Sequence, residues 1–281
     1  MNFSFLRKLA SHSCIAAAAL LAAASVAPAQ GVPNQTVIGQ SSNPMADTIY
    51  RSTVDFEASK EQTAAFQVFS KEQQPAKKIE LGTGFLQKYP KSDYTEKVDV
   101  ELMNAYRGQQ DWNDAFRYGD NALALNPNNV DVLTTIGWTI PHVYDPNGPN
   151  ADKELDKAEK FAKHALEVLS TLPKPANMTD EQFAATKTAR TFQAHSALGL
   201  IYFRRNDYEN SAKELELATK DNPIQDQTDL FVLGVDLQNL NRLSEAADAF
   251  GRCSQIAGPL QNQCKQNAQT ATTQADQSKP K

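Results

Sequence analysis

The dipeptide Leu-Gly occurs twice at an interval of 35 residues, at Leu198-Gly199 and at Leu233-Gly234. The surrounding residues repeat with the same offset, so that Tyr202 corresponds to Leu237 and Leu215 to Phe250. A period of about 34 residues is typical of stacked helix pairs, in which one pair alone cannot bury its apolar side. The sequence therefore predicts an all-α repeat fold that offers a surface to partners.

The first 29 residues have the pattern of a secretory signal peptide. Arg7 and Lys8 precede an apolar, alanine-rich run over residues 14–26, and Ala27-Pro28-Ala29 supplies a small-x-small cleavage pattern. The apolar run is short for a membrane span, which needs about 20 residues. We therefore expect an exported protein, periplasmic or secreted, and a retained N-terminal anchor is the alternative.

The charge of the chain narrows the class of partner. It has 28 Lys+Arg against 33 Asp+Glu, a net charge of −5, and cleavage of the signal removes two of the basic residues. General nucleic-acid binding needs a basic stripe, which this balance does not favour. No later stretch reaches the ~20 apolar residues of a membrane helix, so we expect no membrane segment after signal cleavage.

Two cysteines, Cys253 and Cys264, remain after the signal peptide. Export would place them in an oxidising compartment, where pairing is the rule. A disulfide between them would close a short loop and contribute about 3 kcal/mol in the chain-entropy model. The alternative is a pair of unbonded thiols buried between helices. Because no histidine lies near them in the sequence, we expect no metal there, and we expect no cofactor.

Apolar spacing and turn residues divide the mature chain. Residues 30–53 are rich in Gln, Asn, Ser, Pro and Gly and predict a flexible, disordered leader. A loop at 145–150 contains two prolines and a glycine, and Thr179 with Gln182 resembles a helix-capping box. Residues 261–281 are polar and Gln-rich, and predict a cap followed by a disordered tail. The helix pairs between leader and tail, over 54–260, are expected at about 54–89, 96–129, 130–170, 179–225 and 227–260.

Small residues recur where the two helices of a pair should cross. Glycine within a helix costs about 1 kcal/mol relative to alanine, so its recurrence at one repeat position indicates a packing role. We expect close helix contacts at these small residues, while large residues such as Tyr202 and Phe250 fill the space between pairs. The small residues are Gly137, Gly199 and Gly234 in the first helices, and Ala115, Ser211 and Ala246 in the second.

These residues resemble the tetratricopeptide repeat, whose pattern is Leu-Gly, an aromatic, Ala, a second aromatic, Ala and Pro. Two units depart from the pattern: residues 96–129 have Gly119 at the second aromatic position, and residues 130–170 contain an insertion of about nine residues relative to the ~34-residue unit. The fullest matches are Leu198-Gly199, Tyr202, Ser211, Leu215, Ala218 and Pro223 in residues 192–225, and Leu233-Gly234, Leu237, Ala246, Phe250, Cys253 and Pro259 in residues 227–260.

The resemblance implies a right-handed superhelical solenoid of antiparallel helix pairs whose first helices line a concave groove. Such grooves bind peptides or protein surfaces, and aromatic, arginine and amide side chains suit that role. One subclass grips a C-terminal carboxylate with a Lys/Asn/Arg clamp, but Val100 stands here in the lysine position. Repeat position selects these groove candidates: Asn104, Arg107, Trp138, His142, Gln193, Ser196, Phe203, Arg204, Phe231, Gln238 and Asn239.

Catalytic motifs are missing from the sequence, which favours a non-catalytic scaffold over an enzyme. There is no His-Glu-x-x-His, no Gly-x-Ser-x-Gly and no phosphate loop, and the glycines of Gly82-Thr83-Gly84 are not followed by the third glycine of a dinucleotide fingerprint. His142, His164 and His195 are expected on helix faces. The alternatives are an envelope-assembly or accessory subunit of an exported complex, and an enzyme with an unrecognised site.

The loop after His142 carries a partial calcium-ligand pattern. Asp145, Asn147 and Asp156 occupy the first, third and twelfth places of a calcium-loop template, but Asn150 replaces the glycine that the template requires. The pattern favours an exposed loop that extends a binding surface over a metal site.

Overall fold

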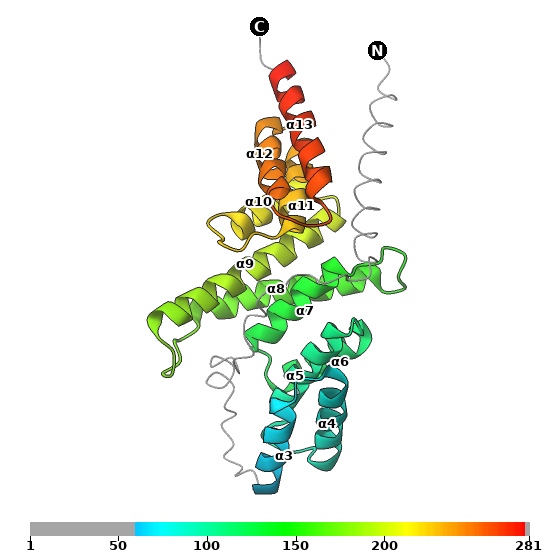
Figure 1. Ribbon diagram of the computed structural model, residues 1–281, viewed down its shortest axis with the longest axis vertical. Coiled ribbons are helices and arrows are strands. Elements are labelled where there is room, and N and C mark those ends of the chain that lie inside the picture. The colour runs from blue at the N-terminus through cyan, green and yellow to red at the C-terminus, as the bar shows by residue number, and fades with distance from the viewer. Residues whose placement is uncertain (1–59, 279–281) are drawn as a thin grey trace. The chain divides into compact units, whose positions relative to one another are not determined.

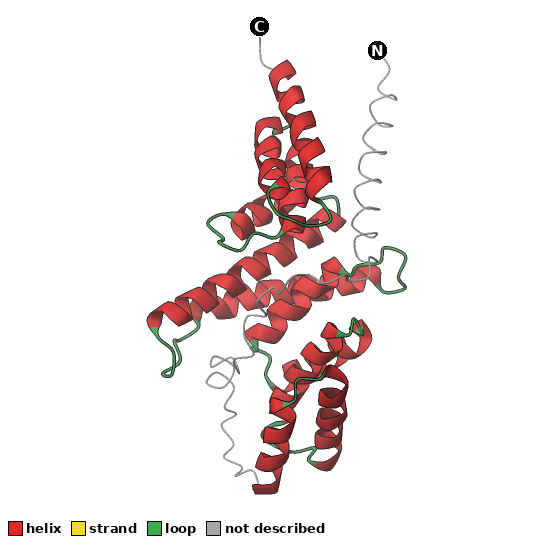
Figure 2. Ribbon diagram, in the orientation of Figure 1, coloured by secondary structure: helices red, strands yellow, loops and turns green. Residues whose placement is uncertain are grey.

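The computed structural model describes residues 60–278 (Figure 1). Every regular element in that range is an α-helix, which confirms the predicted all-α fold class (Figure 2). The predicted signal peptide and the leader at 30–53 lie outside the described residues. In chain order the helices are α3 (Lys60–Lys71), α4 (Pro75–Lys88), α5 (Thr95–Gly108), α6 (Trp112–Leu125), α7 (Val130–His142), α8 (Ala151–Thr171), α9 (Asp180–Arg204), α10 (Tyr208–Thr219), α11 (Gln227–Asn239), α12 (Leu243–Ser254) and α13 (Gln261–Ser278).

The described chain divides into two compact units. The N-terminal unit contains residues 60–138 and 157–198, and the C-terminal unit contains residues 139–156 and 199–278. The limits of the units fall within α7, α8 and α9 rather than in loops. In residues 60–278, every helix is too short or too polar to cross a membrane.

The turn between the two helices of a pair has the same backbone form three times. Gln110, Asn206 and Asn241 all lie in the left-handed region, with φ of 61°, 61° and 58°. In each case the next residue donates its N–H to the carbonyl five residues earlier, which is the bond of a Schellman helix end. The three bonds are Asp111 N to Tyr106 O at 3.0 Å, Asp207 N to Tyr202 O at 3.0 Å, and Arg242 N to Leu237 O at 2.8 Å. The same turn at the same repeat position, four residues after Tyr106, Tyr202 and Leu237, identifies these segments as repeats of one structural unit.

Side-chain caps then start several of the following helices. Asp111 and Asp207 accept from the backbone N–H three residues on, and Asp226 caps α11 in a similar way. The predicted capping box is confirmed, because Gln182 N donates to Thr179 Oγ1 at 3.2 Å and Thr179 N donates to Gln182 Oε1 at 3.0 Å. These caps satisfy N–H groups that have no partner inside their own helix.

Glycines lie where the helices of a pair come closest, as predicted. A methyl group placed on Gly199 would lie 2.5 Å from Leu215 Cγ of α10, and one on Gly234 would lie 2.6 Å from the Phe250 ring of α12. A methyl group on Gly137 would lie 3.4 Å from the Ala158 carbonyl, which is ordinary contact. Leu215 and Phe250 therefore pack directly on glycine backbone in the last two pairs.

Gly119 shows why one unit lacks the second aromatic of the repeat pattern. A methyl group on Gly119 would overlap Ile136 Cδ1 and would lie 3.1 Å from Met103 Sδ. Ile136 belongs to α7, in the next helix pair, and it fills the space that an aromatic on α6 would occupy. The missing aromatic side chain at position 119 is therefore compensated by Ile136, which packs against Gly119.

The prediction of a disordered tail is wrong for residues up to 278, because residues 261–278 form the helix α13. The small residues Cys264, Ala268, Ala271 and Ala275 follow one another at intervals of four, three and four, which places them on one helix face. Cys264, Ala271 and Ala275 are buried, and α13 contacts both α12 and α11. The Gln-rich composition concealed this stripe because alanine contributes little to apolar character.

Helix α13 also brings the two cysteines together. Cys253 lies in α12 and Cys264 in α13, and both side chains are fully buried. Their Cα atoms are 5.7 Å apart, within the range that a disulfide requires.

Replacing Gly199 by Ala should lower the free energy of unfolding by about 1–3 kcal/mol, because the added methyl overpacks Leu215 by more than the gain in helix propensity offsets. Gly251→Ala is the matched control in α12, since apart from its chain neighbours and the nearby backbone of its own helix nothing lies within 4 Å of the place that the new methyl group would take. That control should raise the free energy of unfolding by up to about 1 kcal/mol. Urea denaturation followed by circular dichroism measures both values. Equal effects at the two sites would contradict a close helix contact at Gly199.

Candidate functional site

In the N-terminal unit, α7 and α9 are joined by side-chain bonds, and the charge on α9 reaches a third first helix, α5. Trp138 Nε1 on α7 donates to Ser196 Oγ on α9 at 3.1 Å, and Arg190 Nη2 on α9 lies 2.7 Å from Asp131 Oδ1 on α7. The charge of Arg190 also acts on Arg107 of α5. The exposed and half-buried side chains here are called the first-helix face, and they are Asn104, Arg107, Trp138, Arg190 and Gln193.

Trp138 has a fixed orientation on this face. Its ring is half-buried, and its N–H is held by the buried hydroxyl of Ser196. A tryptophan held in this way presents apolar surface without losing much rotamer freedom when a partner binds, which is a property of residues that dominate interfaces.

The first-helix face carries an excess positive charge. Arg190 donates to Gln193 Oε1 at 2.9 Å and forms an ion pair with Asp131. The Arg107 side chain is exposed, yet loss of part of its water shell lowers its pKa, and the charge of Arg190 lowers the pKa further. Within residues 60–278 no carboxylate forms an ion pair with Arg107. The charge of Arg107 is therefore not neutralised by an ion pair within the described residues.

In the C-terminal unit, Arg204 has a structural task. Its Nε and Nη2 donate to the Pro141 carbonyl at 3.3 and 3.2 Å, and its guanidinium carbon lies 5.6 Å from the centre of the Tyr144 ring. A carbonyl in the last turn of α7 has no partner within the helix, so the arginine satisfies it and complements the helix dipole. Burial lowers the pKa of Arg204.

The other candidates of the C-terminal unit divide by burial. His142 and Gln238 are half-buried and Asn239 is exposed, with its Nδ2 donating to the Val235 carbonyl at 2.8 Å. Phe203 and Phe231 are buried in the core of this unit, with 9% and 1% of their surface exposed.

Burial corrects three of the eleven groove candidates. Phe231 packs edge-on against Phe250 inside the core, and Phe203 packs near Tyr208. Ser196, in the N-terminal unit, has 3% of its surface exposed and is engaged with Trp138. The prediction that these three side chains line an open groove is wrong, because repeat position locates a residue on the first helix without determining what covers it.

Repeat position also missed one residue of the face, Arg190, and its ion-pair partner Asp131. Arg190 precedes the 192–225 repeat window, because α9 begins at Asp180 and is longer than a standard first helix. Asp131, the partner of Arg190, lies in the first turn of α7. The spacing of Arg190 from the candidate Gln193, at i and i+3 on one helix, was the signal that could have found this residue.

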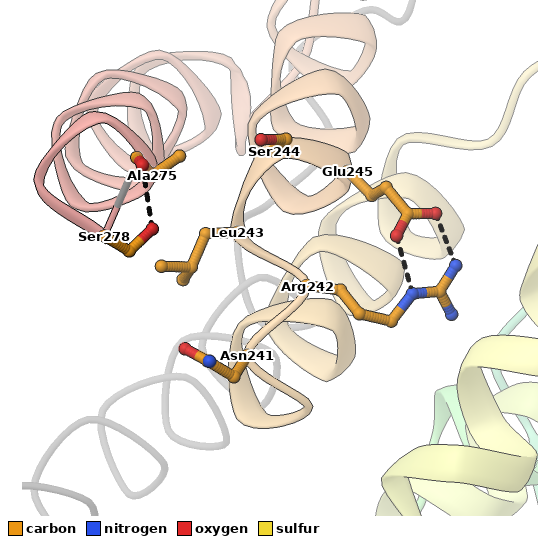
Figure 3. Close-up of a pocket in the computed structure, with 7 residues that line it drawn as sticks. All are labelled: Asn241, Arg242, Leu243, Ser244, Glu245, Ala275 and Ser278. Carbon is orange, nitrogen blue, oxygen red and sulfur yellow. Dashed lines mark hydrogen bonds and ion pairs between the residues drawn. The ribbon is translucent and has the colours of Figure 1, made fainter. Parts of the chain in front are cut away.

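Ionisable side chains gather at a surface depression of the C-terminal unit. Figure 3 shows Arg242 directed at Glu245 at the start of α12, with Ala275 and Ser278 of α13 nearby. Arg242 also lies 2.9 Å from Glu216 Oε1. Hydrogen bonds from Arg242 lower the pKa of Glu245, so this carboxylate stays ionised and paired. A paired, exposed carboxylate is a poor general base, since it is not poised near neutral pH.

The carboxyl groups with raised pKa values lie outside this depression. Glu96 and Asp99 are neighbours one turn apart on α5, where burial and the charge of Glu96 both raise the pKa of Asp99, and Asp236 lies in the other unit. Burial raises the pKa of Glu96 and of Asp99 to about 7 and that of Asp236 to about 8. Glu96 accepts from Asn126 Nδ2 and Asn129 Nδ2, both at 3.0 Å, which ties α5 to the turn before α7. None of the three lines the depression in Figure 3, so the arrangement favours structural roles for them.

Remaining sequence patterns have ordinary structural explanations. Gly82-Thr83-Gly84 lies within helix α4, so it is not a phosphate-binding turn. Asp145 accepts from Asn147 N at 2.9 Å in a local turn. Over residues 60–278, no group of three or more His, Cys, Asp or Glu side chains is placed to hold a metal ion.

Comparison with known proteins adds little to this description. No family model and no curated protein matches the sequence. Among solved structures, a thermophilic TPR protein of Thermus thermophilus matches with 14% identity and a TM-score of 0.45, over 75% of this chain and 97% of that chain. The helix pairs and their repeated turns, rather than this likeness, establish the all-α helical repeat.

Replacing Trp138 by Phe should lower the free energy of unfolding by about 0.5–1.5 kcal/mol, because the ring remains while the bond to Ser196 is lost. Trp112→Phe on α6 serves as the matched control and should have a smaller effect. Urea denaturation of both variants measures the difference. Equal stability of W138F and the parent protein would show that the indole N–H does not hold the ring.

Proposed function

We propose that this protein is a non-catalytic scaffold that binds a peptide segment or protein surface on its first-helix face. The observation that carries the proposal is the exposed guanidinium of Arg107. Its neighbour on this face, Arg190, is already paired with Asp131, so this carboxylate is not free to neutralise Arg107. An unneutralised cation on a packed helical surface favours a partner that supplies an anionic side chain.

The neighbouring side chains suit the rest of such a partner. Trp138 supplies fixed aromatic surface, and the amides of Asn104 and Gln193 can donate and accept hydrogen bonds along an extended backbone. The proposal is supported by the bonds that join α7 to α9, which hold the face in place before binding.

Arg107→Glu should abolish or strongly reduce recovery of the partner in affinity capture followed by mass spectrometry, because reversal of charge places two like charges in contact. Lys160→Glu on α8 is the matched control, since it reverses an exposed charge outside the face. Circular dichroism should show both variants folded. Undiminished recovery with R107E would remove the first-helix face as the binding site.

We further propose that the protein is exported after cleavage following Ala29 and that Cys253 and Cys264 then form a disulfide. The proposal is supported by the signal-like start of the sequence and by the 5.7 Å separation of the two Cα atoms. The bond would join α12 to α13 and stabilise the packing of the terminal helix.

The intact mass of the protein purified from its producing cell should correspond to a chain starting at Gln30. Alkylation without reduction should add no label to Cys253 or Cys264, and alkylation after reduction should add two. Two reactive thiols before reduction, or a mass that retains residues 1–29, would contradict the corresponding half of the proposal.

A further inference from the structure

A buried carboxyl group lies between the last two helix pairs. Asp236 on α11 has no exposed surface, and its Oδ2 lies 2.5 Å from Ser211 Oγ on α10. The same serine oxygen lies 2.8 Å from the Gly199 carbonyl oxygen on α9. The second oxygen of Asp236, Oδ1, has no hydrogen-bond partner within residues 60–278.

The number of protons decides how this chain of oxygens is held together. A serine hydroxyl has one proton, so it can donate to Asp236 or to the Gly199 carbonyl but not to both. With an ionised Asp236, one of the two oxygen contacts would have no proton between its atoms and would be repulsive. With a protonated Asp236, the carboxyl donates to Ser211 Oγ, and Ser211 donates to the Gly199 carbonyl. Both short contacts then become hydrogen bonds.

We propose that Asp236 is protonated in the native protein and that this proton makes the stability of the joint between α9–α10 and α11 fall as pH rises. Removal of the proton leaves a buried charge with an unsatisfied oxygen and one repulsive contact, so the joint weakens as pH rises. The inference is independent of the first-helix face, which belongs to the other unit.

Within the described part of the chain, no cationic group neutralises an ionised Asp236. The charged group that acts on it is Asp207, at the start of α10, and its negative charge opposes ionisation. On α11 itself, Asp229 is a second buried carboxyl two turns earlier. At the start of α12, Arg242 is engaged at the surface with Glu245. The hydrophobic core of this unit is formed by apolar residues of α9 to α13, among them Leu200, Leu215, Leu233 and Phe250.

The direction of the pH effect follows from proton binding. Burial, reinforced by Asp207, raises the pKa of Asp236 to about 8, whereas an unfolded aspartate has a pKa near 3.9. Between these values the folded protein binds a proton that the unfolded chain does not. The contribution of Asp236 to stability is therefore fully present below the unfolded pKa and is lost as pH rises toward 8.

The test compares the parent protein with Asp236→Asn by urea denaturation between about pH 5 and about pH 8. Asparagine has the same shape, and its Nδ2–H can donate to Ser211 permanently. The unfolding equilibrium constant of the parent protein relative to that of D236N should rise about tenfold per pH unit over this range. Asp248→Asn, an exposed site on α12, is the matched control and should show no such trend. If the ratio of the two unfolding equilibrium constants, parent protein to D236N, stays constant with pH, the proposal is overturned.

A second measurement covers the case in which D236N does not fold. The carboxyl carbon of Asp236, observed by NMR in protein with labelled aspartate, should have the chemical shift of a neutral acid at about pH 6 and should titrate toward pH 8. A resonance of an ionised carboxylate at about pH 6 would show that the proton is absent and would end the proposal.

Discussion

The close crossing of two helices at a glycine is the contact on which the last two repeats depend. At Gly199 and Gly234 a large side chain of the second helix rests on the backbone of the first, and a single methyl group would not fit. This contact sets the separation of the helices in a pair. The Schellman turns at Asn206 and Asn241 then reverse the chain at that separation. The last two helix pairs therefore have the same local geometry.

Tight packing has a consequence for the polar groups at the joints. Ser211 is the small residue that lets α10 approach α9, and the same closeness brings its hydroxyl within reach of both the Gly199 carbonyl and Asp236. A carboxyl group held there loses its water and favours the neutral form. The pH sensitivity that we propose thus arises from the same close helix packing that forms the repeat. The Arg204 bond to the Pro141 carbonyl similarly uses a charged side chain to complete a helix end.

The candidate face shows how far repeat position can predict a binding surface. Asn104 and Arg107 are exposed and Trp138 and Gln193 are half-buried, so their predicted role in binding stays a prediction. Repeat position failed for Phe231 because every residue of α11 from Asp229 to Leu237 is buried, enclosed by neighbouring helices and by α13. It missed Arg190 because α9 extends beyond the repeat. The exposure of a side chain on a first helix depends on which helices pack beside it, and the repeat pattern of the sequence does not specify those helices.

The sequence by itself determined the all-α repeat, the helix pairs and the small residues at their crossings, because a 34-residue period and helical spacing are local properties of the chain. Only the tertiary structure decided that residues 261–278 form a packed helix, that Ile136 replaces a missing aromatic beside Gly119, and that Asp236 is buried against Ser211. Each of these depends on side chains brought together from different helices. Their burial and the pKa that follows from it arise only when the pairs pack against one another.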